Sequence, residues 1–152
     1  MPQERLPSGR VGQFPSPSRR RMLTTRFRGV PFIRHLGMRL DALEDGTATI
    51  SMAAKPALHQ YQGLVHGGAI SSLADTAATF AVLTRIPEKT DVVTIEFKMN
   101  FLAPLRKGRT TALARTLRLG RRIAVAEVRI IQKGESEPAA VGIFTMLVFP
   151  VS

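Results

Sequence analysis

The chain contains no cysteine and no tryptophan, and it has only three histidines. Without cysteine, disulfides, thiolate nucleophiles and zinc–thiolate sites are excluded together. His35, His59 and His66 show no spacing typical of a metal site, so we expect neither a metal nor another cofactor. No apolar run approaches the roughly 20 residues that a membrane-spanning helix needs, and no secretory signal is recognisable. We therefore expect a cytoplasmic protein without a membrane partner.

Acidic residues are also scarce, because 11 Asp and Glu face 22 Lys and Arg and leave a net charge of +11. Residues 1–30 hold seven arginines against Glu4 and so carry more than half of this excess. Their many prolines and weak apolar periodicity predict a disordered basic arm. The run Arg19-Arg20-Arg21 could contact an anionic surface, but the arm is too short and irregular for a helix-turn-helix. We expect no nucleic-acid partner.

Residues 31–152 are expected to form one domain with a single core. Alternating apolar residues predict a hairpin over residues 37–52, with Glu44-Asp45-Gly46 as its turn. A period of two predicts four further strands, at residues 93–101, 109–119, 123–131 and 139–149. The short turns between these four imply antiparallel neighbours. Simple alternation in the first of them places Thr94 and Phe97 on opposite faces.

The most informative segment is residues 60–85, in which residues 69–83 predict an almost wholly apolar and therefore buried helix. Four of its polar residues fall on one helical face at i, i+3, i+4 and i+7: Ser72, Asp75, Thr76 and Thr79. A carboxylate at this position costs several kcal/mol unless it has partners or a raised pKa. Asp75 is either a structural carboxylate, accepting from Ser71 or Ser72 and a neighbouring strand, or a catalytic group.

A His-Gly-Gly turn precedes this helix. The N–H groups of Gly67 and Gly68 fall in the first turn, where they lack intrahelical partners and meet the positive end of the helix dipole. Such amides suit a developing oxyanion on a carbonyl. Asp75 lies about nine residues, or roughly 13 Å of helix, from this end. We expect an extended substrate or a partner subunit to bridge the two groups.

The order of elements is two strands, one long buried helix, then four strands. A helix that is apolar on most sides is best buried by a sheet that curls around it, which gives an α+β fold. Such a sheet leaves an exposed edge, so we expect a dimer that continues the sheet.

These motifs resemble one known family. The pattern Gln60-x5-His66-Gly67-Gly68-x6-Asp75, then Thr94, then Phe101-Leu102-Ala103-Pro104 and Gly120-Arg121, resembles the hotdog-fold acyl-CoA thioesterases, and most of all their phenylacetate-degradation (PaaI-like) branch. The resemblance covers roughly residues 32–149. It implies a central helix wrapped by an antiparallel sheet of about five to six strands, with sites at the interface of a homodimer or homotetramer. It also implies hydrolysis of a short-chain or aromatic acyl-CoA to the free acid and coenzyme A.

The resemblance further implies roles for single residues. Asp75 matches the carboxylate that acts as nucleophile or as general base, and both roles stay open. Gly67 matches the amide that polarises the thioester carbonyl, and Gln60 and His66 match side chains that position water or the leaving thiolate. Thr94 matches a Ser or Thr contributed by the partner subunit. Thr79 matches a second polar group one helical turn after the acid.

Coenzyme A carries three phosphates, and residues 106–122 contain seven cations and no acid. Arg121 and Arg122 follow a glycine in a turn, where their forked donors can reach a phosphate. We expect these two to bind coenzyme A. Arg115 and Arg118 are interpreted as solvated strand positions.

The acyl group is expected to meet a pocket lined by Tyr61, Leu64, Phe80 and Leu83. The alternative function is a non-catalytic acyl-CoA-binding or regulatory hotdog protein. A hotdog hydratase or dehydratase is a third hypothesis, but the acid and amide arrangement of those enzymes is not evident here. Because a binding protein has no need of a buried carboxylate, the presence of Asp75, Gln60 and Thr94 favours the enzyme.

Overall fold

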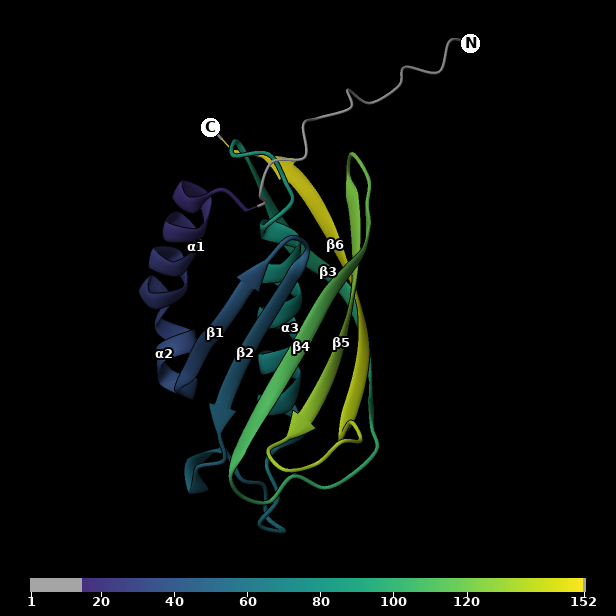
Figure 1. The fold of residues 1–152 in the computed structure, drawn as a ribbon. Helices are drawn as coiled ribbons and strands as arrows, with labels where there is room; N and C mark the ends of the chain where they lie inside the picture. Colours follow the sequence, from purple (N-terminus) through teal and green to yellow (C-terminus); the bar gives the residue numbers. More distant parts are fainter. Residues whose placement is uncertain (1–14, 152) are drawn as a thin grey trace.

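The computed structural model describes residues 15–151 of the chain. In chain order, its elements are α1 (Pro17–Gly29), α2 (Pro31–Leu36), β1 (Met38–Glu44), β2 (Thr47–Ala53), the short 3-10 helix η1 (Pro56–Leu58), α3 (Gly67–Leu83), β3 (Thr90–Phe101), β4 (Arg109–Leu119), β5 (Ile123–Gln132) and β6 (Ala140–Pro150). The strands form one open antiparallel sheet of six in the order β1-β2-β4-β5-β6-β3, and this sheet curves around α3 (Figure 1).

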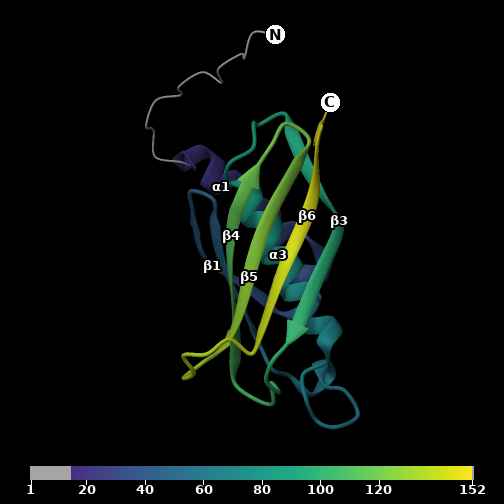
Figure 2. The ribbon, with the colours of Figure 1, turned by 90° about the vertical axis from the view of Figure 1, so that its right-hand side faces the viewer.

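The predicted fold class is confirmed, because one long central helix lies against a curled antiparallel sheet (Figure 2). Each predicted strand and the buried helix are present close to their expected bounds. Gly46 closes the first hairpin with a φ of 71°, in the left-handed region that favours glycine. The dimer stays a prediction.

The core lies between α3 and the concave face of the sheet. Small side chains on α3, among them Ala74, Ala77 and Ala78, are fully buried, and so are Ala112 and Ala126 on the facing strands. Alanine on both sides allows the helix backbone to approach the sheet closely, and the larger side chains fill the space around this contact. Of the helices that the structure describes, none is both long and apolar enough to cross a membrane.

The predicted neighbours of β3 are wrong, because β3 pairs with β6 and not with β4. The segment 102–108, which contains Pro104, carries the chain from one edge strand to the middle of the sheet. It is fixed on the way by a backbone hydrogen bond from Val65 N–H to Leu105 O, 2.7 Å long. As a result, β3 is an edge strand with one hydrogen-bonded neighbour.

A β-bulge in β3 overturns the prediction that Thr94 and Phe97 lie on opposite faces. The pairing with β6 shifts between residues 94 and 96, so Ile95 is the extra residue. Thr94 is paired with Met146 and Phe97 with Phe144, and both of these partners are buried on the inner face of β6. Because paired residues point to the same side of a sheet, Thr94 and Phe97 both face α3.

The prediction of a disordered arm is wrong for residues 17–29, which form α1, while residues 1–14 lie outside the described part of the chain. Ser16 is the N-cap and accepts from Arg19 N–H at 3.2 Å, and Pro17 occupies the first turn. Leu23 and Phe27, one turn apart, are buried against the domain. A helix this polar is stabilised by tertiary packing, which its composition does not reveal.

Gly142 of β6 offers a test of the packing between β6 and β3. A Cβ at this position would collide with Met99 Sδ and would lie 3.0 Å from the backbone oxygen of Lys98 and from the Phe144 ring. We expect Gly142→Ala to lower the free energy of unfolding by roughly 1–3 kcal/mol, because a backbone atom cannot move aside cheaply. A Cβ at Gly29, at the end of α1, would have nothing within 4 Å, so Gly29→Ala should be neutral or slightly stabilising.

Urea unfolding of the two variants measures the difference. Equal stability of the two would contradict the packing described here.

Candidate active site

Asp75 lies half-buried on α3 and accepts a hydrogen bond from Thr94 Oγ1, with 2.6 Å between Oδ1 and the hydroxyl oxygen. Burial raises the pKa of Asp75 above its usual value, and the hydrogen bond from Thr94 partly opposes this. The serine part of the structural interpretation is not supported, because the Ser72 hydroxyl donates to Gly68 O instead, at 2.8 Å. The partner of the carboxylate comes from the neighbouring strand.

Thr94 bonds to Asp75 of its own chain. The role that the resemblance implied for Thr94, at a site shared with the partner subunit, stays a prediction. The bulge at Ile95 belongs to the same arrangement, since it lets the residues on both sides of it face α3.

Only one of the two expected oxyanion donors is free. His66 is the N-cap of α3, and its Nδ1 accepts from Gly68 N–H at 2.8 Å. The Gly68 amide is therefore occupied, while no described residue accepts from Gly67 N–H. An imidazole that accepts through Nδ1 carries its proton on Nε2 and is neutral, which agrees with an orienting role for His66 rather than that of a cation.

A side chain at either glycine would crowd the residue beside it. A Cβ on residue 68 would stand 2.9 Å from His66 Nδ1, and a Cβ on residue 67 would stand 3.3 Å from the Phe101 ring. Phe101 is 52% exposed and lies beside the free amide of Gly67. Sequence reasoning did not select Phe101 as a site residue, because the direction of its side chain depends on the bulge six residues earlier.

The loop before α3 carries three of the predicted site residues, Gln60, Tyr61 and Leu64. Gln60 is half-buried, and its backbone N–H donates to Leu64 O at 2.8 Å, which closes the loop. Leu64 is half-buried as well, and Tyr61 is fully exposed. Phe80 and Leu83 belong to the buried core and do not line an open pocket, while the acyl-binding role of Tyr61 and Leu64 stays a prediction.

The other hydroxyls on the polar face of α3 differ in availability. Thr76 donates to Ser72 O at 2.8 Å and is satisfied within the helix. Thr79, one turn after Asp75, is half-buried and forms no hydrogen bond with the residues that the structure describes. Thr79 is therefore free to contact a ligand, as the resemblance implied.

Arg121 and Arg122 lie at the opposite end of α3 from Gly67. At the C-terminal end of α3, Thr84 Oγ1 accepts from Gly46 N–H at 2.8 Å, and Gly46 O accepts from Thr116 N–H at 2.7 Å. The turn between β4 and β5, which carries both arginines, is at this same end (Figure 1). One chain therefore does not bring these arginines and the Gly67 amide together.

Two other cations lie at the Gly67 end. Arg106 and Lys107 follow Leu105, whose carbonyl accepts from Val65 N–H, directly before His66. They line a hollow of about 340 Å³ together with Glu135 and Glu137. The hollow thus holds both signs of charge.

The helix α3 carries a free amide at its tip and a half-buried carboxylate two turns further on, and these are the two kinds of group that polarise a carbonyl and activate its attacker. Within residues 15–151, no group of three or more His, Asp or Glu side chains could hold a metal ion.

Comparison with known proteins adds independent evidence. A model of the thioesterase superfamily matches residues 62–139. PA1618 of Pseudomonas aeruginosa, named as an esterase, is 35% identical over 77% of this chain and 81% of that protein. The 1,4-dihydroxy-2-naphthoyl-CoA hydrolase of Listeria monocytogenes is 29% identical over 66% of this chain and 81% of that protein. The crystal structure of a thioesterase family protein from Silicibacter pomeroyi has a TM-score of 0.82 at 29% identity, over 87% of this chain and 98% of that chain.

The raised pKa of Asp75 predicts a stability cost that depends on pH. Because the folded state holds the Asp75 proton more tightly than the unfolded state, stability falls as pH rises through the interval between the ordinary value of 3.8 and the raised folded value. Asn cannot ionise and still accepts from Thr94. We expect Asp75→Asn to be more stable than the wild type near pH 7, with a difference that shrinks as the pH falls toward 3.8.

Thermal unfolding of both proteins across this pH range measures the difference. A variant that is less stable than the wild type at neutral pH would show that the charge is well compensated.

Proposed function

Because the chain belongs to the thioesterase superfamily and is a thioester hydrolase, we propose that it hydrolyses short-chain or aromatic acyl-CoA thioesters to the free acid and coenzyme A. The observation that carries this proposal is the half-buried carboxylate of Asp75 on the helix whose tip offers the free amide of Gly67. A relative that is named as the hydrolase of an aromatic acyl-CoA supports the aromatic part.

In the proposed reaction, Gly67 N–H donates to the thioester oxygen and stabilises the negative charge that develops there. Asp75 takes a proton from water while the water oxygen adds to the carbonyl carbon. Collapse of the tetrahedral intermediate breaks the C–S bond and releases the thiolate of coenzyme A, and the proton then leaves Asp75 for the thiolate or solvent. The raised pKa makes Asp75 a stronger base than an ordinary carboxylate. Direct attack by the carboxylate, through an anhydride, is the alternative route.

A second copy of the chain is part of the proposal. Gly67 and Asp75 are eight residues apart on one straight helix, about 12 Å along its axis, so one helix cannot place both groups on the same carbonyl. We propose that the amide of one chain and the Asp75 of a second copy act on one substrate. The free edge of β3 supports this, because its apolar residues Val93 and Ile95 are 49% and 56% exposed.

Gln60, His66 and Thr79 are proposed to complete the site. His66 fixes the helix tip through its bond to Gly68, and as an exposed residue it can also orient water or the thiolate through Nε2. Gln60, in the loop directly before this tip, and the unpaired hydroxyl of Thr79 are the remaining polar groups. Phe101 is proposed to contact the acyl group next to the Gly67 amide.

The test is release of free thiol from a panel of acyl-CoAs with acetyl, hexanoyl, palmitoyl, benzoyl and phenylacetyl groups. We expect turnover of the short and aromatic substrates, and we expect Asp75→Asn to lower kcat at least about 100-fold, because the base is lost while the shape is kept. Ser72→Ala is the matched control, since its hydroxyl only contacts the backbone of its own helix.

Binding of these ligands without thiol release by the wild type would favour the non-catalytic acyl-CoA-binding function. Activity confined to palmitoyl-CoA would contradict the proposed substrate class.

The phosphates of coenzyme A are proposed to contact Arg121 and Arg122, which one chain holds far from its own Gly67 but which a second copy can supply. We expect the double variant Arg121→Gln/Arg122→Gln to raise KM about tenfold with little change in kcat, because two charge-assisted contacts are lost away from the reacting atoms. The same change at Arg106 and Lys107 is the control. A rise in KM for the control alone would place the phosphates at the Gly67 end of the same chain.

A further inference from the structure

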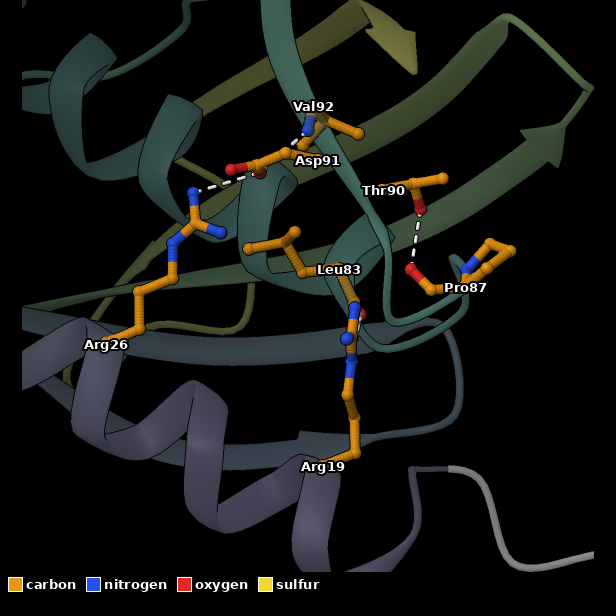
Figure 3. Close-up of polar contacts among 7 residues, drawn as sticks. All are labelled: Arg19, Arg26, Leu83, Pro87, Thr90, Asp91 and Val92. Atoms are coloured by element: carbon orange, nitrogen blue, oxygen red, sulfur yellow. Dashed lines mark hydrogen bonds and ion pairs between the residues drawn. The ribbon is translucent and has the colours of Figure 1, made fainter. Parts of the chain in front are cut away.

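The helix α1, which the sequence did not predict, contacts both α3, which carries Asp75, and β3, which carries Thr94. Arg19, only 5% exposed, donates from Nε and Nη2 to the carbonyl oxygen of Leu83, at 3.2 and 2.9 Å (Figure 3). Leu83 is the last residue of α3, and a carbonyl in this position has no acceptor role within the helix. The guanidinium therefore satisfies this carbonyl and also meets the negative end of the helix dipole.

The same helix holds the beginning of β3. Arg26 Nη2 contacts Asp91 Oδ1 at 3.0 Å, and this oxygen also accepts from Val92 N–H at 2.8 Å (Figure 3). Because β3 is an edge strand paired only with β6, its other side has no neighbour in the sheet that the structure describes. The ion pair from α1 therefore holds the first residues of β3 in addition to their pairing with β6.

Apolar packing fixes α1 between these two polar contacts. Leu23 is fully buried, and the Phe27 ring meets the Phe80 ring of α3 edge to face, with 5.2 Å between the ring centres. Arg19, Leu23 and Phe27 follow one another at intervals of four, so they share one helical face. The side chains of α1 thus contact the last part of α3 and the start of β3.

The Asp75–Thr94 hydrogen bond joins the two segments that α1 holds. Asp75 precedes Leu83 by eight residues on α3, and Thr94 follows Asp91 by three residues on β3. We infer that α1 sets the spacing between α3 and the start of β3, and that Arg19 and Arg26 are positioning residues for the Asp75–Thr94 pair. The inference rests on the proposed function for its catalytic meaning, but the spacing itself can be measured without turnover.

Titration of Asp75 reports this spacing. Among the described residues, the pKa of Asp75 responds to burial and to the Thr94 hydroxyl, and no charged side chain of α3 or of the strands packed on it contributes. If Thr94 moves away, the hydrogen bond that stabilises the carboxylate weakens and the pKa rises further. A loss of overall stability that leaves the pair intact would not have this effect.

The experiment compares Arg19→Met with Arg20→Met in the whole 152-residue chain. Both changes remove one arginine from α1 and keep a long side chain, but Arg20 is exposed and its side chain forms no hydrogen bond or ion pair with the residues that the structure describes. The titration of Asp75 is followed by carbon-13 NMR of protein labelled at aspartate, beside the pH dependence of kcat/KM. We expect Arg19→Met to raise the Asp75 midpoint and the acid limb of the rate profile together, by roughly half to one pH unit. Arg20→Met should match the wild type.

A second variant covers the case in which Arg19→Met fails to fold. Arg26→Met removes only a partly exposed ion pair, so the protein should fold, and we expect a smaller shift of the Asp75 midpoint in the same direction. An Asp75 titration identical to that of the wild type in folded Arg19→Met or Arg26→Met protein would overturn the inference and leave α1 a structural element only. Because NMR needs no substrate, an absence of thioesterase activity would count against the proposed function and not against the spacing.

Discussion

A carboxylate set into an apolar helix is the constraint on which the rest of the structure depends. Asp75 is half-buried, so its charge is disfavoured, and Thr94 is its hydrogen-bond donor among the described residues. This hydrogen bond requires the first half of β3 to run beside α3 with Thr94 facing the helix. Pairing of Thr94 with the buried Met146 of β6 gives it this direction, and α1 contacts the end of α3 and the start of β3.

The sequence pattern predicted the strands well because apolar and polar residues alternate along them, before and after α3. The turn at Gly46 and the strands up to residue 150 lie close to their predicted places. The neighbours of β3 could not be predicted in this way. Residues 102–108, which join β3 to β4, are long enough for β3 to lie either next to β4 or at the edge of the sheet beyond β6. α1 was missed because only Leu23 and Phe27 carry its apolar contact, while a buried arginine completes it.

The residue types of the candidate site were predictable from the sequence, but the directions of their side chains were not. Asp75 stands out in sequence as the one acid of an apolar helix, and His66-Gly67-Gly68 as its tip. The hydrogen bond from Gly68 N–H to His66 Nδ1 depends on the side-chain torsion of His66, which the spacing of residues in the sequence does not reveal. Exposure of Tyr61 and the contact of Phe101 with Gly67 likewise depend on loop path and strand register.

The extra residue Ile95 shifts the alternation of β3 by one position, so that the choice of residues facing α3 changes from there on. Before the insertion, the strand offers a hydroxyl to the helix, and after it the strand offers the aromatic rings of Phe97 and Phe101 to the same side. A strictly alternating strand could not do this with these residues, because Thr94 and Phe97 are an odd number of positions apart. One strand therefore serves two chemical environments, and backbone pairing fixes the boundary between them.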